Sequence, residues 1–155
     1  MDGFLTAREV LSSRVECQVI DVFDISPATV GTFDVTLFLG VFYHLRNPLL
    51  ALDMLAAVTR ELIIVESHVT RAEDEDVPLM RFYQGAELDG DPTNWWGPNL
   101  LCLAQMVRSA GFPRVEVKCY PEFRTRRKRL LQRLGLRKPP RKRLPDSRAV
   151  VFGYK

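Results

Sequence analysis

The feature that most constrains the fold is an apolar run that ends abruptly in polar side chains. Residues 35–41 are almost all apolar, which is typical of a parallel strand covered on both faces. Four side chains that can hydrogen-bond or stack follow within five residues, namely Tyr43, His44, Arg46 and Asn47. Because ligands of open α/β sheets bind at the carboxyl ends of the strands, we expect this junction to form one wall of a ligand site.

The other segments alternate between strand-like and helix-like patterns. The patterns predict helices at residues 4–12, 48–60 and 99–110, and strands at residues 15–20, 35–41, 62–65, 114–120 and 148–154. This order favours an α/β fold whose sheet is mostly parallel, with an antiparallel C-terminal strand at its edge. Residues 70–98 show no regular pattern, and an irregular stretch of this length is usually functional.

Length and composition limit the domain count and the compartment. A chain of 155 residues with 46% hydrophobic residues is long enough for one domain with its own core. No apolar run reaches the roughly 18 residues of a membrane span, and the first residues lack a secretory signal, so we expect a cytoplasmic protein. The cysteines are too widely spaced to bind a metal together, and we expect reduced core residues at Cys17, Cys102 and Cys119.

Basic residues are concentrated in one segment near the C-terminus. Residues 124–143, called here the basic segment, contain 11 of the 22 Lys and Arg residues and no Asp or Glu. The rest of the chain has 11 basic and 19 acidic residues, a net charge of −8. The basic segment is either a solvated surface segment or a binding site for a polyanion such as RNA or an anionic membrane surface.

Two short motifs carry a resemblance to a known family. Residues 40–48 read Gly-Val-Phe-Tyr-His-Leu-Arg-Asn-Pro, and residues 95–99 read Trp-Trp-Gly-Pro-Asn. With them, residues 1–155 apart from the basic segment resemble the C-terminal two-thirds of a class I S-adenosylmethionine-dependent methyltransferase. More narrowly, the first motif is similar to one family of these enzymes, which transfer a methyl or carboxymethyl group. That family includes the enzyme that completes the 5-oxyacetic-acid modification of the tRNA wobble uridine. The resemblance implies a partial Rossmann-like sheet.

The same resemblance implies a cofactor, S-adenosylmethionine or a carboxylated derivative of it. Matching positions place three residues along the adenine: Asp21, Val22 and Phe23. They place three others beside the methionine part and the sulfonium: Leu39, Gly40 and Tyr43. Candidates for contact with the acceptor are Arg46, Trp95, Trp96 and Asn99. Several have a purely structural alternative, since Asp21 can begin a turn, Asn47 and Asn99 can cap helices, and a tryptophan can plug a loop.

The chain also departs from this family. None of its nine glycines is followed by another two positions later, so the Gly-x-Gly turn that holds the cofactor is missing. The first two strands of the family's sheet are missing with it. We therefore expect a chain that lacks part of its cofactor site, whose open strand edge favours a second copy or a partner chain that completes the sheet.

Two functions from different classes remain. One is methyl or carboxymethyl transfer to a nucleophile of an RNA, a sugar or another small molecule. Its catalytic candidates are His44 and Tyr43. His44 is the first candidate for the base, and Glu66 and His68 are weaker ones. The other is a catalytically silent remnant that binds RNA, a membrane surface or a protein partner through the basic segment.

Overall fold

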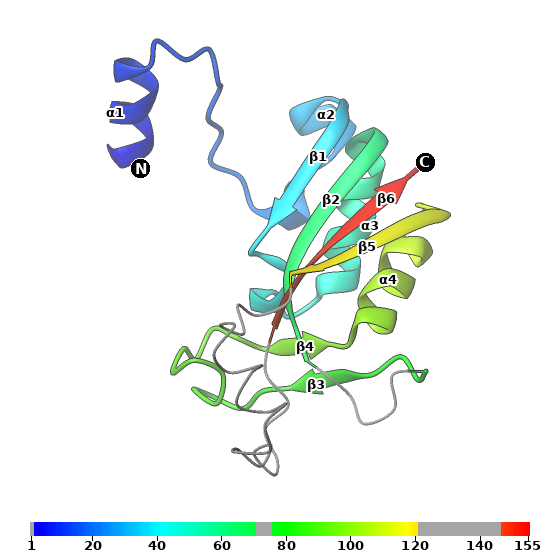
Figure 1. The fold of residues 1–155 in the computed structure, drawn as a ribbon. Helices are drawn as coiled ribbons and strands as arrows, with labels where there is room; N and C mark the ends of the chain where they lie inside the picture. The colour runs from blue at the N-terminus through cyan, green and yellow to red at the C-terminus, as the bar shows by residue number, and fades with distance from the viewer. Residues whose placement is uncertain (1, 71–75, 121–146) are drawn as a thin grey trace, which may run out of the picture.

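The computed structural model describes residues 2–70, 76–120 and 147–155, and its main sheet has four strands in the order β1-β2-β6-β5 (Figure 1). The strands are β1 (Phe33–Leu39), β2 (Thr59–Val69), β5 (Arg114–Tyr120) and β6 (Ser147–Tyr154). Strands β1 and β2 pair in parallel, while β6 pairs antiparallel with both β2 and β5. Three strands therefore run in one direction, and the predicted mixed α/β class is confirmed.

The antiparallel strand lies at a different position from the one we expected. Strand β6 lies between β2 and β5, so β5 and not β6 forms that edge of the sheet. The burial of the two strands gives the reason, because Ala149 and Val151 of β6 are fully buried, whereas Val117 of β5 is exposed. The more apolar strand takes the interior position, where both of its edges are paired.

Two helices cover one face of the sheet. Helix α3 (Pro48–Val58) buries Leu52 and Leu55, and α4 (Leu100–Ser109) buries Leu103 and Val107. These side chains share one core with residues from all parts of the sheet, among them Phe38, Ile63, Val65, Phe112 and Val151. Burial of apolar area on this scale is the dominant favourable term for folding.

The opposite face of β1 is open, which contradicts the prediction of a strand covered on both faces. Only Phe38 of this strand is buried, whereas Val35, Leu37 and Leu39 are 49%, 61% and 50% exposed. The apolar run was a sound signal for a strand, but no described helix packs on its second face. β1 is also an edge strand of the sheet.

The N-terminal part differs most from the prediction. Helix α1 (Asp2–Val10) forms as expected but buries no residue. The strand predicted at residues 15–20 does not form, and Val19 there is 83% exposed. A strand needs a neighbour for its hydrogen bonds, and no described strand lies beside this segment. Cys17 is exposed, so its predicted place in the core was wrong, whereas Cys102 is half-buried.

After residue 20 the chain forms two short helical turns, η1 (Val22–Asp24) and α2 (Pro27–Val30), and η1 packs on α3.

Strand β2 is longer than its apolar core. It continues to Val69, so Glu66, Ser67 and His68 lie inside the strand and not after it as predicted. Pairing with β6 explains the extension, because the register matches Glu66 with Val150 and His68 with Arg148.

The stretch predicted to be irregular contains a short antiparallel pair, β3 (Met80–Phe82) with β4 (Trp96–Pro98). The basic segment lies outside the described residues. In the part of the chain that the structure describes, no helix is long and apolar enough to span a membrane, and no group of His, Cys, Asp and Glu is suited to hold a metal ion.

Close packing around Gly153 on β6 yields a first prediction. A Cβ atom there would lie 2.6 Å from Val107 Cγ1 and 3.0 Å from both Ile63 Cγ2 and Phe112 Cβ, so α4 could not pack on the sheet as it does. We expect Gly153→Ala to lower the free energy of unfolding by about 1–3 kcal/mol, measured by urea denaturation.

The matched control is Gly3→Ala on α1, where a Cβ meets no atom within 4 Å. That variant should be as stable as the wild type or slightly more stable, since alanine favours helix. A Gly153→Ala protein within about 0.5 kcal/mol of the wild type would contradict this description of the core.

Candidate active site

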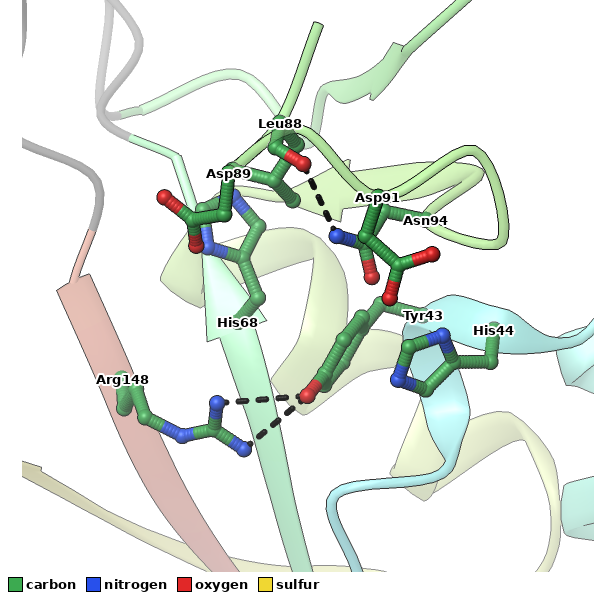
Figure 2. A pocket seen from close by; sticks show the side chains of 8 residues that line it. All are labelled: Tyr43, His44, His68, Leu88, Asp89, Asp91, Asn94 and Arg148. Atoms are coloured by element: carbon green, nitrogen blue, oxygen red, sulfur yellow. Dashed lines mark hydrogen bonds between the residues drawn. The ribbon is translucent and has the colours of Figure 1, made fainter. Parts of the chain in front are cut away.

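A cavity of about 400 Å³ lies where the sequence predicted a ligand wall. Its lining comes from the turn after β1, from β2 and β6, and from the segment between β3 and β4 (Figure 2). Most of the lining is polar or aromatic, and the residues are Tyr43, His44, His68, Leu88, Asp89, Asp91, Asn94 and Arg148. The end of the apolar run therefore lines a cavity, to which Tyr43 and His44 both belong, and its role as one wall of a ligand site stays a prediction.

A glycine turn brings Tyr43 and His44 to the cavity. Gly40 ends β1 with φ 71°, a conformation in which any residue with a Cβ is disfavoured. Its N–H donates to the carbonyl of Glu66 at 3.1 Å, which ties the turn to β2. The chain then forms the short helix η2 (Phe42–His44), which buries Phe42 and Tyr43.

Arg148 connects the strands to Tyr43. Its guanidinium donates from Nη2 to Glu66 Oε2 at 2.7 Å and from Nε to the other carboxylate oxygen. Nη1 and Nη2 also donate to Tyr43 Oη, each at 3.2 Å (Figure 2). The hydrogen bond with Glu66 raises the pKa of Arg148, which is already charged at neutral pH. Glu66 balances this charge, and Tyr43 is held at the cavity wall.

The hydrogen bonds of His44 fix which ring nitrogen carries the proton. Nδ1 lies 3.1 Å from the carbonyl oxygen of Thr93 and 3.0 Å from its Oγ1. Thr93 Oγ1 donates its own proton to Asp91 Oδ1 at 2.7 Å. Both Thr93 oxygens are therefore acceptors towards the ring, so Nδ1 is the donor. In the neutral ring Nε2 then has the lone pair, and no described residue hydrogen-bonds to it.

His68 is held by different contacts. It is buried on β2, and its Nε2 lies 2.9 Å from Tyr83 Oη. Gly97 makes this arrangement possible, since a Cβ atom at Gly97 would lie 2.7 Å from Tyr83 Oη and 3.2 Å from His68 Nε2. His68 is therefore fixed in place by packing, in contrast to the half-buried His44.

Of the four residues predicted to contact the acceptor, Arg46, Trp95 and Trp96 lie in one aromatic cluster, whereas Asn99 caps a helix. The guanidinium of Arg46 lies 4.3 Å from the centre of the Trp95 ring, and Trp95 in turn stacks on Phe82. These rings, with Trp96, form an aromatic cluster beside the lining residues. The backbone of Trp95 does reach the site, because its N–H donates to the carbonyl of Tyr43 at 2.9 Å.

The two asparagines behave differently. Asn99 caps α4, since its Oδ1 accepts from Cys102 N at 2.8 Å and its Nδ2 donates to Val77 O at 2.6 Å. Asn47 occupies the corresponding position of α3, but its side chain makes no capping hydrogen bond, so the predicted cap is wrong there.

The residues predicted for the cofactor are not among the lining residues, apart from Tyr43. Asp21 accepts a hydrogen bond from Phe23 N at 2.9 Å, which is the local turn that was its structural alternative. Val22 packs against the core, and Leu39 is half-exposed at the end of β1. Their roles towards a cofactor stay predictions.

Sequence reasoning missed five lining residues, namely Leu88, Asp89, Asp91, Asn94 and Arg148. The run Asp89-Gly90-Asp91-Pro92 inside a long irregular stretch was the available signal, because such residues form tight turns that can carry functional side chains. Nothing in the strand pattern of β6 indicated that Arg148 faces Tyr43.

The comparisons with known proteins identify the fold. No model of a protein family matches the sequence, and no curated protein matches it either. Among solved structures, the N-terminal domain of EvdMO1 in the presence of SAH and D-fucose aligns with TM-score 0.64 and 22% identity. That alignment covers 97% of this chain and 59% of the other, so the chain spans about three-fifths of that structure's length.

A SAM-dependent methyltransferase from Archaeoglobus fulgidus aligns with TM-score 0.60 and 11% identity, over 99% of this chain and 81% of its own. The chain therefore has a fold found in SAM-dependent methyltransferases, as the sequence predicted. The narrower resemblance to the tRNA-modifying family stays a prediction.

The turn around Asp91 yields a second prediction. The Thr93 backbone N–H donates to Asp91 at 2.8 Å, and together with the Thr93 hydroxyl it holds the pKa of Asp91 below its usual value of 3.8. A lowered pKa means that the turn is stabilised above pH 3.8 and loses this support as the pH falls through the folded-state pKa.

In Thr93→Ala the hydroxyl donor is lost, so we expect the pKa of Asp91 to rise, measured by the carboxyl carbon shift in NMR. At a fixed pH the backbone shifts of Asp53, an exposed residue on α3, should be the same in both proteins. An unchanged pKa of Asp91 would show that the hydroxyl does not bond to it in solution.

Proposed function

We propose that the cavity serves SAM-dependent methyl transfer to an oxygen nucleophile. The observation that supports it best is the arrangement of His44, Thr93 and Asp91, which leaves His44 Nε2 available at the cavity within a methyltransferase fold. A base placed in this way suits a hydroxyl acceptor, whose proton must leave as the oxygen attacks.

The described residues fit a sulfonium cofactor on its methionine side. Gly40 presents backbone without a side chain at the end of β1, and Tyr43 follows it. The carboxylates of Asp89 and Asp91 line the cavity, and Asp89 makes no hydrogen bond or ion pair with a described residue, which favours a cationic ligand. On the adenine side the proposed contacts are Asp21, Val22 and Phe23. When bound, the cofactor supplies a methyl carbon that is electrophilic because of the positive sulfur.

The residues of the chain then bind, orient and accept a proton. His44 takes the proton of the acceptor hydroxyl at Nε2, and the resulting positive charge on the ring is stabilised by the Thr93 carbonyl and the nearby Asp91 carboxylate. Tyr43, whose ring lies next to that of His44 and whose hydroxyl is held by Arg148, positions the acceptor beside the base. Holding the two reactants in line is the main contribution that the protein makes to such a displacement.

The acceptor classes that the sequence left open were RNA, a sugar or another small molecule. EvdMO1, the first structure compared, was solved in the presence of D-fucose as well as SAH, which supports a sugar-like acceptor. The basic segment, on which RNA binding would depend, lies outside the described residues, so RNA stays an alternative.

Replacing His44 tests the proposed base. We expect His44→Gln to lower kcat for methyl transfer by about 10²–10⁴-fold with little change in KM, because the base acts in the transition state. The measurement is SAH formation with a panel of hydroxylated acceptors that includes D-fucose.

Cys17→Ser, an exposed change outside the cavity, is the control and should keep the wild-type rate. If His44→Gln retains full activity, the base lies elsewhere.

A second candidate function is a catalytically silent remnant that binds a partner. It is favoured by the outer edge of β1, which pairs with no other described strand, and by the exposed apolar face formed by Val35, Leu37 and Leu39. Such an edge offers backbone groups to a second copy or another protein, or invites aggregation. Asp21 also favours this alternative, because its carboxylate accepts a hydrogen bond from Phe23 N within its own turn.

Calorimetric titration with S-adenosylmethionine separates the two candidates. The enzyme hypothesis predicts micromolar binding, about −8 kcal/mol, that weakens in Gly40→Val because a branched side chain cannot adopt φ 71° without strain. Gly3→Val, on the helix that buries no residue, is the matched control. Absence of binding, together with a concentration-dependent dimer in sedimentation, would favour the remnant.

A further inference from the structure

We infer that the acceptor is a neutral polyhydroxyl molecule, recognised through hydroxyl groups that donate hydrogen bonds to Asp89, Asp91 and Asn94. This inference rests on the proposed function and names the substrate class of the same cavity. The three residues stand together on one side of the cavity, in the segment that joins β3 to β4 (Figure 2).

Asn94 gives the clearest sign of a missing donor. It is only 5% exposed, and its Nδ2 donates to the carbonyl of Leu88 at 3.0 Å, which fixes the orientation of the amide. Its Oδ1 is buried and has no hydrogen-bond partner among the described residues. In Figure 2 this oxygen points away from Leu88, towards Tyr43. Buried carbonyl oxygens are nearly always paired, so a ligand hydroxyl entering from the cavity satisfies it.

The two carboxylates add acceptors of the same kind. Asp89 adopts φ 53° and Gly90 φ 74°, so two successive left-handed residues turn the chain between the two aspartates. Asp89 has no hydrogen bond or ion pair with a described residue, and the bonds of Asp91 to Thr93 use only Oδ1. Ionised carboxylates accept hydrogen bonds and cannot donate them, so a ligand must supply the protons.

The balance of charge separates neutral ligands from anions. Arg148 is the cation of the cavity lining, and Glu66 already compensates it. Asp89 and Asp91 have no such partner among the described residues, so the cavity repels phosphate and carboxylate groups. Asp89, Asp91, Asn94 and His44 Nε2 offer acceptors at separate points, which a ring with several hydroxyls can satisfy together. Leu88 provides an apolar contact for the C–H groups of such a ring.

The test compares two sugars that share one ring, and it measures binding without methyl transfer. D-fucose is neutral, and D-galacturonate has a carboxylate in place of its methyl group. Each is titrated into the full chain, and the dissociation constant is read from NMR shift changes. We expect D-fucose to bind more tightly than D-galacturonate, and Asp89→Asn to weaken D-fucose by about tenfold, because hydrogen bonds to charged acceptors are roughly twice as strong as neutral ones.

The variants are chosen to leave the fold intact. Asp89→Asn keeps the size of the side chain and tolerates the left-handed backbone, and Asp53→Asn on the exposed face of α3 is the matched control with unchanged affinity. Asn94→Leu, with its fold checked by circular dichroism, should weaken D-fucose as well.

The inference is overturned if neither sugar binds, if D-galacturonate binds more tightly than D-fucose, or if Asp89→Asn leaves the affinity for D-fucose unchanged. The proposed function fails separately, when S-adenosylmethionine does not bind or His44→Gln keeps its rate. A chain that binds D-fucose through Asp89 but transfers no methyl group would support this subsite and reject the enzyme.

Discussion

The ion pair between Arg148 and Glu66 joins the three segments on which the cavity depends. Arg148 comes from β6 and Glu66 from β2, and the same guanidinium holds the phenol of Tyr43 after β1. Glu66 also accepts the hydrogen bond from Gly40 through its backbone, so one residue fixes both the turn and the arginine. The parallel pairing of β1 with β2 brings Leu39 opposite Glu66. β1 ends there and its turn leads to Tyr43, whereas β2 continues through His68, and both residues line the cavity.

The parts of the fold that local patterns specify were predicted well. β5 was predicted with its bounds, and α3, α4 and β6 within about two residues, because apolar periodicity and turn residues are local properties. The parts that failed depend on a neighbour. Residues 15–20 have the alternation of a strand, but no described strand lies beside them, whereas β2 extends through polar residues because β6 lies beside it. A pattern in one segment cannot show which edge will be paired.

The site divides in the same way. Tyr43 and His44 were predicted because a strand that ends in polar residues is visible in the sequence, and both do line the cavity. The proton position on His44 could not be predicted, since it depends on Thr93, which lies far along the chain. Asn94 resembles any loop asparagine until its amide is seen to be buried. Asn47 and Asn99 make the same point, because identical positions before a helix give a cap in one case only.

The charge arrangement of the cavity links the proposed cofactor, base and acceptor. An uncompensated carboxylate suits a sulfonium cation and a hydroxyl donor alike, so the chemistry that favours the cofactor also selects the acceptor. Asp91 supports the proposed base, because its Oδ1 orients Thr93 and through it His44, whereas Asp89 makes no hydrogen bond with His44 or Thr93. The two aspartates therefore separate by role, and loss of Asp89 affects the ligand while loss of Asp91 also disturbs the proton position on His44. This division is possible because the Asp89–Asp91 turn places one carboxylate at the histidine and leaves the other facing the cavity.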